Sequence, residues 1–174
     1  MNATDPVTLW FTGLPGSGKT TLACLMAERL RQQHGLKTEV LDGDGVRRMI
    51  GGVGYSREDR RRHVVSSAFT AFMLNKNGIF VTAAFVSPYR SMRKEARDLI
   101  GRRFVEVFVE CPISVCRKRD PKGLYKKFKD GLITGLTGVD DPYEVPIDPE
   151  IVLKTDDYTP DECLLKIEEY LKTR

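Results

Sequence analysis

The chain carries Gly13-Leu14-Pro15-Gly16-Ser17-Gly18-Lys19-Thr20 directly after a short apolar run, and this stretch matches the pattern G-x-x-x-x-G-K-[ST] at every fixed position. Glycines here allow a tight loop whose backbone N–H groups point inward at phosphate oxygens, and the following helix adds the positive end of its dipole. In this pattern Lys19 reaches the β- and γ-phosphates, and the hydroxyl of Thr20 ligates Mg²⁺. We therefore predict an ATP phosphate site from Gly13 through Thr20, extended by Thr21.

A glycine-rich turn that merely joins a strand to a helix is the alternative interpretation, so the flanking sequence matters. Val7 to Thr12 is apolar and β-branched, which is typical of a buried strand. Apolar residues at steps of three and four between Leu22 and Leu30 predict a helix that ends near Gly35. The motif thus lies between a strand and a helix, the context in which it binds phosphate.

The rest of the chain continues this alternation of strands and helices. We predict strands at 38–41, 79–86, 104–109 and 151–153, and helices at about 57–77, 91–100 and 159–171, with a glycine-rich loop at 51–54. The alternation indicates a parallel sheet covered on both faces. We expect one α/β domain over 1–174, a P-loop kinase fold with a five-stranded parallel sheet.

Composition supports a single intracellular domain. The 174 residues are 41% apolar, which is enough for one core. The chain has no apolar run of membrane-spanning length and no signal-peptide pattern at its start, so we expect a cytoplasmic protein without a membrane partner. Its four cysteines form no C-x-x-C pair, which favours buried or idle thiols over a zinc site.

The net charge of +4 is concentrated in basic runs at 57–62 and 117–129. Such runs suit a polyanion, either a nucleotide or a nucleic acid. We interpret 117–127 as part of a mobile lid over ATP, within a lid region of about 117–138, with a solvated helix face as the alternative.

A nucleotide-binding switch or RNA-associated ATPase is the competing class of function. The central strand leads to Ser87, where a hydrolytic switch would offer an acidic metal ligand, and the basic runs hold few aromatic residues. We therefore expect no nucleic-acid partner. A catalytically silent scaffold is disfavoured because Lys19, Thr20 and the acidic turn are all present.

An acidic turn follows the second predicted strand. Ligands of open parallel sheets bind beyond the carboxyl ends of the strands, where Asp42 and Asp44 stand on either side of Gly43. Paired carboxylates near Mg²⁺ can hold its water shell and accept a proton from an attacking hydroxyl. The alternative is an Asx-type turn or a helix N-cap by Asp44.

Further polar residues are candidates for the acceptor side. Ser87 follows the central strand, where its hydroxyl can meet the γ-phosphate or, alternatively, cap the next helix. Arg47, Arg60 and Arg90 are candidates for paired hydrogen bonds to phosphate or sulfate, with a solvated surface charge as the alternative for each. Tyr55 can stack on a base or pack within its loop.

Taken together, the motifs resemble those of the adenylylsulfate kinase family, which phosphorylates the 3′-hydroxyl of adenosine 5′-phosphosulfate. The matching stretches span nearly the whole chain, in order: Phe11-Thr12-Gly13-Leu14, Leu41-Asp42-Gly43-Asp44 with Val46-Arg47, Gly54-Tyr55-Ser56 with Asp59-Arg60, Phe85-Val86-Ser87-Pro88-Tyr89-Arg90, Arg119-Asp120-Pro121-Lys122-Gly123-Leu124-Tyr125 and Asp141-Pro142-Tyr143-Glu144. The resemblance implies Mg²⁺ATP as donor, 3′-phosphoadenosine 5′-phosphosulfate as product, and a homodimer. A related kinase acting on another nucleotide-linked anion is the alternative.

The resemblance also implies roles for individual residues. Arg47 and Arg60 match residues that hold the phosphosulfate end, Tyr55 matches an aromatic that stacks on the acceptor adenine, and Ser87 matches a serine assigned as a phosphoserine intermediate. Because in-line transfer needs only positioning and charge neutralisation, we expect Ser87 to orient phosphate.

The expected site residues fall into four groups. The catalytic group is Lys19, Asp42, Asp44 and Ser87. ATP is bound by the phosphate loop with Thr21, Arg117 and Lys122, and the metal by Thr20 and Asp42. The acceptor is bound by Asp44, Arg47, Tyr55, Arg60, His63, Val86, Ser87, Lys122, Gly123, Leu124 and Leu136.

Three residues depart from the family pattern. Gly45 and His63 each stand where the family has asparagine, and Leu136 replaces a phenylalanine expected on the other face of the acceptor adenine. Loss of one aromatic wall weakens base stacking by about 1–3 kcal/mol. We therefore expect the donor chemistry to be unaffected and the acceptor to be the more variable partner.

Overall fold

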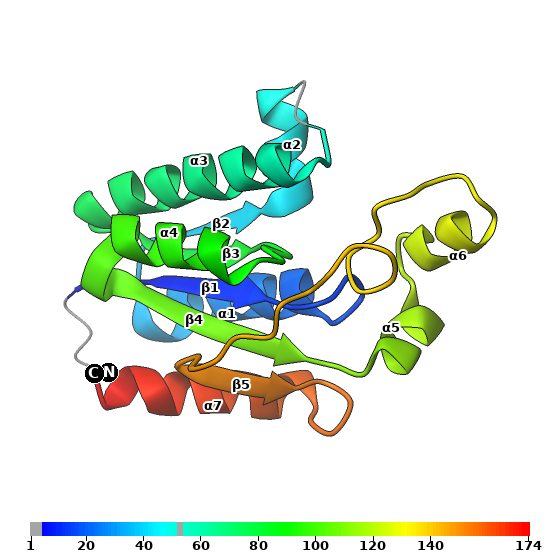
Figure 1. Cartoon of the computed structure of the whole chain (residues 1–174). Coiled ribbons are helices and arrows are strands. Elements are labelled where there is room, and N and C mark those ends of the chain that lie inside the picture. Colours follow the sequence, from blue (N-terminus) through cyan, green and yellow to red (C-terminus); the bar gives the residue numbers. More distant parts are fainter. Residues whose placement is uncertain (1–4, 52–53) are drawn as a thin grey trace.

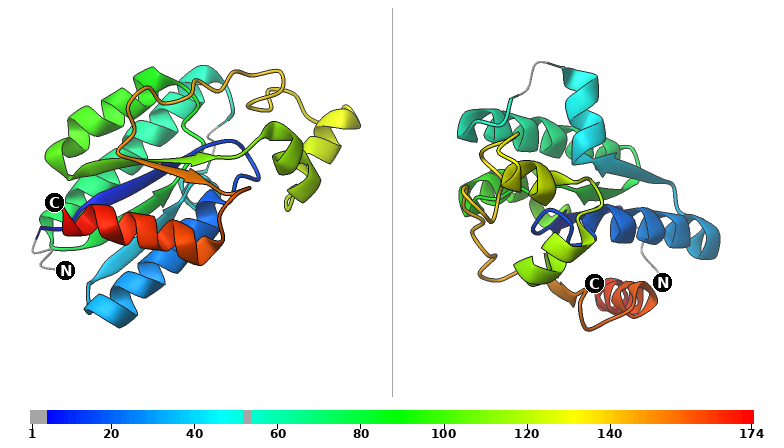
Figure 2. Two further views of the ribbon diagram at one scale, coloured as in Figure 1. Left: turned by 90° about the horizontal axis from the view of Figure 1, so that it is seen from below. Right: turned by 90° about the vertical axis from the view of Figure 1, so that its right-hand side faces the viewer.

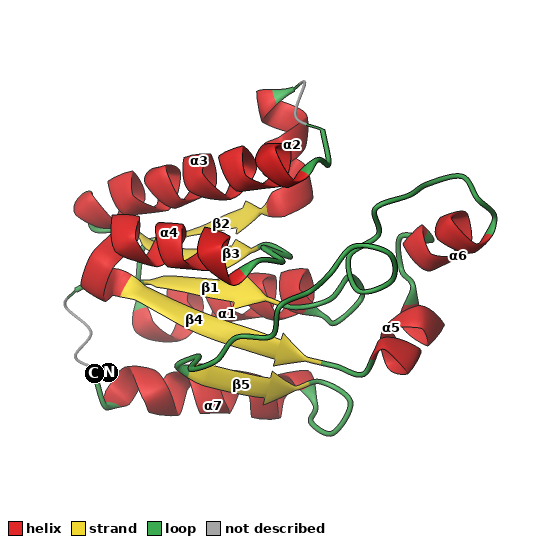
Figure 3. Cartoon of the chain, viewed as in Figure 1, coloured by secondary structure: helices red, strands yellow, loops and turns green. Residues whose placement is uncertain are grey.

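The fold is a five-stranded parallel sheet with helices on both faces, as Figures 1 and 3 show. The computed structural model describes residues 5–51 and 54–174, so the first residues and the middle of the expected 51–54 loop lie outside the described part. The strand order is β2-β3-β1-β4-β5. The strands are β1 (Thr8–Thr12), β2 (Thr38–Asp42), β3 (Phe80–Ala84), β4 (Phe104–Glu110) and β5 (Ile151–Lys154).

Helices cover both faces of the sheet (Figure 2). The side chains of β1 alternate: Leu9 and Phe11 pack with α1 (Lys19–His34) and α7 (Pro160–Lys172), whereas Trp10 packs with α3 (Arg57–Lys76) and α4 (Arg90–Ile100). Because successive residues of a strand point to opposite faces, one apolar strand holds both layers together. The five-stranded parallel sheet predicted from the sequence is confirmed.

The region after β2 differs from the sequence prediction. A helix, α2 (Gly43–Ile50), begins where we predicted an acidic turn, with a helix N-cap by Asp44 as the alternative. Its N-cap is Asp42, whose carboxylate accepts a hydrogen bond from Gly45 N at 3.0 Å. Asp44 therefore lies in the first turn of the helix and does not cap it, because the helix begins at Gly43, two residues before the start that a cap at Asp44 would require.

The basic run folds as two short helices that pack beside the phosphate loop. They are α5 (Ile113–Arg119) and α6 (Leu124–Lys129), preceded by the 3₁₀ turn Gly101–Arg103 between α4 and β4. Cys116 of α5 and Tyr125 of α6 form a small apolar cluster, called here the lid cluster, with two residues outside the helices, Cys111 and Leu136. The Tyr125 hydroxyl donates to Pro15 O at 2.9 Å, so this run is more than a solvated helix face.

Within residues 5–51 and 54–174, none of the helices combines the length and apolar character needed to cross a bilayer.

Candidate active site

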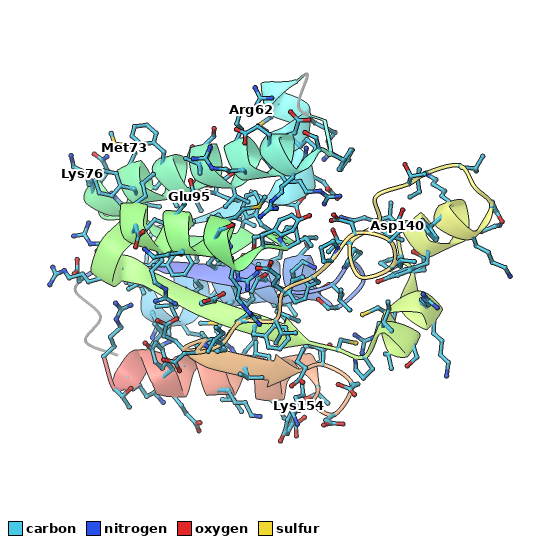
Figure 4. All side chains as sticks on the ribbon, in the orientation of Figure 1. Arg62, Met73, Lys76, Glu95, Asp140 and Lys154 are labelled. Carbon is cyan, nitrogen blue, oxygen red and sulfur yellow. The ribbon has the colours of Figure 1, made fainter. Side chains whose placement is uncertain are left out.

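One cleft of about 1500 Å³ opens at the carboxyl ends of the strands. The phosphate loop forms one end, α2 and the start of α3 form the other, and the segment 119–137 borders both. In Figure 4, the label of Asp140 marks the side of the lid segment, and Met73 and Lys76 mark the opposite end of the molecule, on α3. Ligands of open parallel sheets bind at this position.

The phosphate loop depends on glycine at two places. Gly13 has a φ of 154°, and a Cβ there would lie 2.5 Å from the backbone oxygen of Val109. Gly18 caps α1 in the left-handed conformation with a φ of 98°, which side chains disfavour. The loop therefore brings its backbone N–H groups to the start of α1 without steric hindrance, and this is an anion-binding arrangement.

Lys19 is buried beneath this loop. Its Nζ donates to Leu14 O at 2.7 Å, and only 8% of the residue is exposed. Burial lowers the pKa of Lys19 from 10.5 to about 8. Anionic phosphates that enter the loop would raise the pKa of Lys19 again and so favour its charged form.

Thr20 and Asp42 meet at the mouth of the loop. The Thr20 hydroxyl donates to Asp42 Oδ1 at 2.9 Å, while Oδ2 of the same carboxylate caps α2. A hydroxyl and a carboxylate are hard oxygen ligands, which suits Mg²⁺ shared with nucleotide phosphates. Within the described residues, there is no group of three or more His, Cys, Asp or Glu side chains that could hold a metal ion.

Asp44 faces the lid side of the cleft. Lys122 Nζ lies 2.5 Å from Asp44 Oδ2, and both side chains are about half exposed. Burial alone would raise the pKa of Asp44, but the hydrogen bond and charge of Lys122 outweigh it and hold the pKa below its ordinary value. The pair joins α2 to the lid segment while keeping the carboxylate ionised.

Ser87 lines the cleft, but its hydroxyl is engaged in a buried network. The Oγ accepts from Trp10 Nε1 and donates to Thr12 Oγ1, each at 3.1 Å, and Ser87 is only 3% exposed. Its φ of 37° is rare outside glycine and costs on the order of 1–3 kcal/mol. The N-cap of α4 is Tyr89, so Ser87 does not cap that helix.

Tyr55 is flanked by the two arginines of the predicted acceptor site. Arg47 and Arg60 place their guanidinium carbons 4.5 Å and 5.7 Å from the centre of its ring. Tyr55 is 65% exposed. An exposed aromatic ring between two cations, in a cleft, is suited to an anion that carries a flat base.

Arg60 ties this region to the segment after the lid helices. Its Nε donates to Tyr55 O at 2.9 Å, and its NH2 donates to Gly135 O at 2.7 Å. Asp141 lies 3.7 Å away, so part of the charge of Arg60 is balanced within the protein. Arg60 therefore links the backbone at Tyr55 to the backbone at Gly135, next to Leu136.

His63 lies behind Arg47. Its Nδ1 is 3.2 Å from Arg47 NH2, and its ring contacts Phe85 edge-on at a centroid distance of 5.3 Å. Burial, followed by the positive charge of Arg47, lowers the pKa of His63 from 6.5 to about 4. The imidazole is therefore neutral near pH 7.

The remaining expected residues divide into those that line the cleft and those that do not. Val86, Lys122, Leu124 and Leu136 line it, whereas Arg117 and Gly123 do not. Leu136 also packs in the lid cluster and is only 6% exposed, so it presents less of its side chain than an open stacking wall would. Arg90 is an exposed residue held by Val145 O and does not line the cleft.

Sequence reasoning missed Arg119 and Thr155. Arg119 lines the cleft and donates to Thr155 Oγ1 at 3.1 Å, and Thr155 in turn donates to Ser17 O at 2.9 Å. The two residues brace the phosphate loop from the side of β5. Arg119 stands in the basic run of 117–127, but the pattern of so short a helix does not indicate which of its arginines faces the cleft.

Comparisons with known proteins indicate the family. A family model described as adenylylsulphate kinase matches residues 5–154. Adenylyl-sulfate kinase of Synechococcus sp. (strain JA-2-3B'a(2-13)) is 49% identical over 97% of this chain and 95% of its own length. The corresponding protein of Clostridium kluyveri is 43% identical over 97% of this chain and 84% of its own.

A solved structure extends the agreement to the fold. The Mycobacterium tuberculosis APS kinase CysC, in complex with AMPPNP and APS, superposes with a TM-score of 0.91 at 37% identity, over 97% of this chain and 98% of that one.

Proposed function

The chain belongs to the adenylylsulfate kinase family, and on this premise we propose that it transfers the γ-phosphoryl group of ATP to the 3′-hydroxyl of adenosine 5′-phosphosulfate. The product is 3′-phosphoadenosine 5′-phosphosulfate. The observation that carries the proposal is a single cleft lined both by Lys19 of the phosphate loop and by Arg47 and Arg60 beside Tyr55. Such a cleft can hold a triphosphate and a second anionic nucleotide together.

The donor half of the site binds ATP through the phosphate loop. The backbone of 13–18 surrounds the phosphates, and Lys19 supplies the positive charge on which their binding depends. Arg119 borders this half from α5 and supports the loop through Thr155. Arg117 is exposed and outside the cleft, so we assign it no contact with ATP.

Thr20 and Asp42 would hold Mg²⁺ in the same half. The Thr20 hydroxyl and Asp42 Oδ1 already lie 2.9 Å apart. When bound, the ion neutralises phosphate charge. Asp42 keeps its second oxygen on the N-terminus of α2, and this fixes the orientation of the carboxylate.

Asp44 is our candidate for the group that accepts the proton of the 3′-hydroxyl. It lines the cleft and its low pKa keeps it ionised, which a proton acceptor requires at the start of the reaction. Lys122 pairs with it in this structure. We propose that the acceptor separates this pair, so that Lys122 turns to the phosphates and Asp44 to the hydroxyl.

Ser87 has a positioning role in this scheme. Its hydroxyl is committed to Trp10 and Thr12, and its carbonyl oxygen accepts from Arg93 NH1 at 2.7 Å. A serine with these three hydrogen bonds is a poor phosphate acceptor. The same bonds hold the backbone that lines the cleft after β3 in place. Direct in-line transfer needs no more from Ser87.

The acceptor half consists of Arg47, Arg60 and Tyr55, with Leu136 on the lid side. We propose that the arginines hold the phosphosulfate and that the ring of Tyr55 stacks on adenine. We also propose that the 117–138 segment moves as a lid, that the protein is a homodimer, and that it works in the cytoplasm. Light scattering of the purified protein tests the dimer.

The direct experiment supplies purified protein with ATP, Mg²⁺ and adenosine 5′-phosphosulfate and separates the products by ion exchange. We expect a product phosphorylated at the 3′ position, absent without acceptor. If ATP binds but this product does not form, the acceptor assignment is wrong, and other nucleotide-linked anions become the candidates.

A further inference from the structure

We propose that His63 is a positioning residue that holds Arg47 in place for the anionic end of the acceptor, through a hydrogen bond at Nδ1. The inference rests on the function proposed above and concerns a position for which the resemblance implies asparagine.

His63 lies between Arg47 and the aromatic ring of Phe85. It stands in α3, is 5% exposed, and points its Nδ1 at Arg47 of α2 across a gap of 3.2 Å. On the other side its ring meets Phe85 edge-on, with 62° between the planes. Phe85 itself stacks on Trp10 at 4.8 Å, so the imidazole rests on the core of the domain. A ring held this way has little freedom to turn away from Arg47.

The chemistry of Arg47 and His63 fixes the direction of the hydrogen bond between them. A guanidinium only donates hydrogen bonds, so Nδ1 must accept and the ring hydrogen must lie on Nε2. The charged groups that act on the ring are Arg47 and Asp44, of which Arg47 disfavours a second positive charge. Nε2 has no hydrogen-bond partner in the described part of the chain, which adds to the cost of ionisation. The ring therefore stays a neutral acceptor.

A neutral partner suits an arginine that must bind an anion. A carboxylate at this position would orient Arg47 equally well but would cancel much of its charge. The imidazole orients the guanidinium without adding a negative charge beside it. Arg60, by comparison, has the carboxylate of Asp141 3.7 Å from its NH2. Arg47 also donates to Gly54 O, and both arginines stay assigned to the anion.

Two substitutions at one position separate positioning from packing. His63→Leu removes the acceptor at similar size, and His63→Asn restores an oxygen near the place of Nδ1. We expect His63→Leu to raise the KM for adenosine 5′-phosphosulfate roughly tenfold, the scale of one hydrogen bond to a charged group. The KM for ATP should change less than about twofold, and His63→Asn should recover most of the loss.

The chain offers a matched control in its other histidine. His34 lies in α1, pairs with Glu168 at 3.5 Å, and does not line the cleft. His34→Leu should leave the acceptor KM unchanged. Thermal melting of all variants reports on folding, and a loss of both KM values together in His63→Leu would indicate a packing role and overturn the proposal.

A double-mutant cycle with Arg47→Ala tests the route of the effect. If His63 acts through Arg47, then His63→Leu adds nothing to acceptor binding once Arg47 is gone. Binding is measured by calorimetry with adenosine 5′-phosphosulfate and a non-hydrolysable ATP analogue. Additive losses would overturn the proposal.

Imidazole nitrogen NMR tests the pair without any activity measurement. With only two histidines, the His63 signals are identified by their loss in His63→Asn. We expect the Nε2–H tautomer, unchanged between pH 6 and 8; an Nδ1–H tautomer or a cationic ring would contradict the proposal. Failure of the unmodified protein to phosphorylate the acceptor would count against the proposed function, whereas the tautomer bears on His63 alone.

Discussion

The donor half of the cleft is built from backbone and buried groups, whereas the acceptor half is built from side chains of separate elements. In the donor half, Lys19 is 8% exposed and lies beneath a loop shaped by glycines. In the acceptor half, Tyr55 is 65% exposed, and Arg47 and Arg60 reach it from α2 and α3. The first half is therefore mostly buried before its ligand binds, whereas the second half leaves more side-chain surface for its ligand to cover.

This difference separates what is common to phosphoryl transfer from what selects the acceptor. Backbone N–H groups bind phosphate whatever the rest of the nucleotide is, so a loop of this kind serves any ATP-dependent kinase. Side chains such as Tyr55 and His63 can change one at a time. The three positions at which the resemblance implies a departure from the family pattern, Gly45, His63 and Leu136, lie outside the phosphate loop.

The largest expected effect is in the donor half. Lys19→Met removes the buried charge that meets the γ-phosphate, so turnover should fall by roughly 10³-fold or more. The change keeps an apolar chain of similar length in the buried site, and the melting temperature should not fall. Steady-state transfer and a thermal melt check both points, and near-normal turnover would contradict the role given to the loop.

The next effect belongs to the acceptor half. Tyr55→Ala removes the exposed ring, and the KM for adenosine 5′-phosphosulfate should rise about tenfold, since stacking on one base contributes about 1–3 kcal/mol. The KM for ATP should stay within about twofold. Tyr158, the other exposed tyrosine at the cleft, gives a matched control as Tyr158→Ala. Equal losses for both nucleotides in Tyr55→Ala would mean that the halves are not separate.

A pH titration compares the halves without mutation. The pKa of Lys19 is about 8 in the ligand-free protein, so its charge is lost as the pH rises through that value. ATP affinity should fall above pH 8, while the affinity for the acceptor, bound by arginines, should not. Calorimetry at pH 7, 8 and 9 measures both, and a parallel decline would contradict the assignment.

The lowered pKa of Lys19 also predicts that the stability of the protein changes with pH in the direction opposite to ATP affinity. Its folded pKa lies below the unfolded value of 10.5, so between about pH 8 and 10.5 the unfolded chain binds more protons. The contribution of Lys19 to stability therefore rises with pH across that window. The difference in melting temperature between Lys19→Met and the unmodified protein should shrink as the pH increases.

The smallest effect should be at Gly45. A Cβ there would meet Asp42 Oδ2 at 3.7 Å, an ordinary contact, and the residue lies in a helix. Gly45→Ala should therefore stabilise the protein by about 0.5–1 kcal/mol and raise its melting temperature by a few degrees, with little change in turnover. A lower melting temperature would show that α2 needs glycine at this position.

Sequence patterns predicted the strand, loop and helix of the donor half because these elements follow one another in the chain. The fixed positions of the phosphate loop are contiguous, and the strand and helix on either side have clear periodicity. The sheet followed from the same alternation. The helix α2 was missed because Gly43-Asp44-Gly45 favours a turn by composition, and only the cap by Asp42 and the packing of the domain make it helical.

The acceptor half was harder because its contacts join distant residues. The pairing of Arg47 with His63, and of Lys122 with Asp44, depends on how α2, α3 and the lid segment meet. The positive φ of Ser87 and its bond from Trp10 also follow from tertiary structure, so no pattern revealed that its hydroxyl is engaged.

The most direct test of the account compares two acceptors that differ only in the sulfate. Turnover is measured with Mg²⁺ATP and either adenosine 5′-phosphosulfate or adenosine 5′-monophosphate, at matched concentrations. Because Arg47 and Arg60 beside Tyr55 are assigned to the phosphosulfate end, the account predicts a kcat/KM at least about tenfold higher for the sulfated nucleotide. Equal turnover, or a preference for the monophosphate, would contradict it.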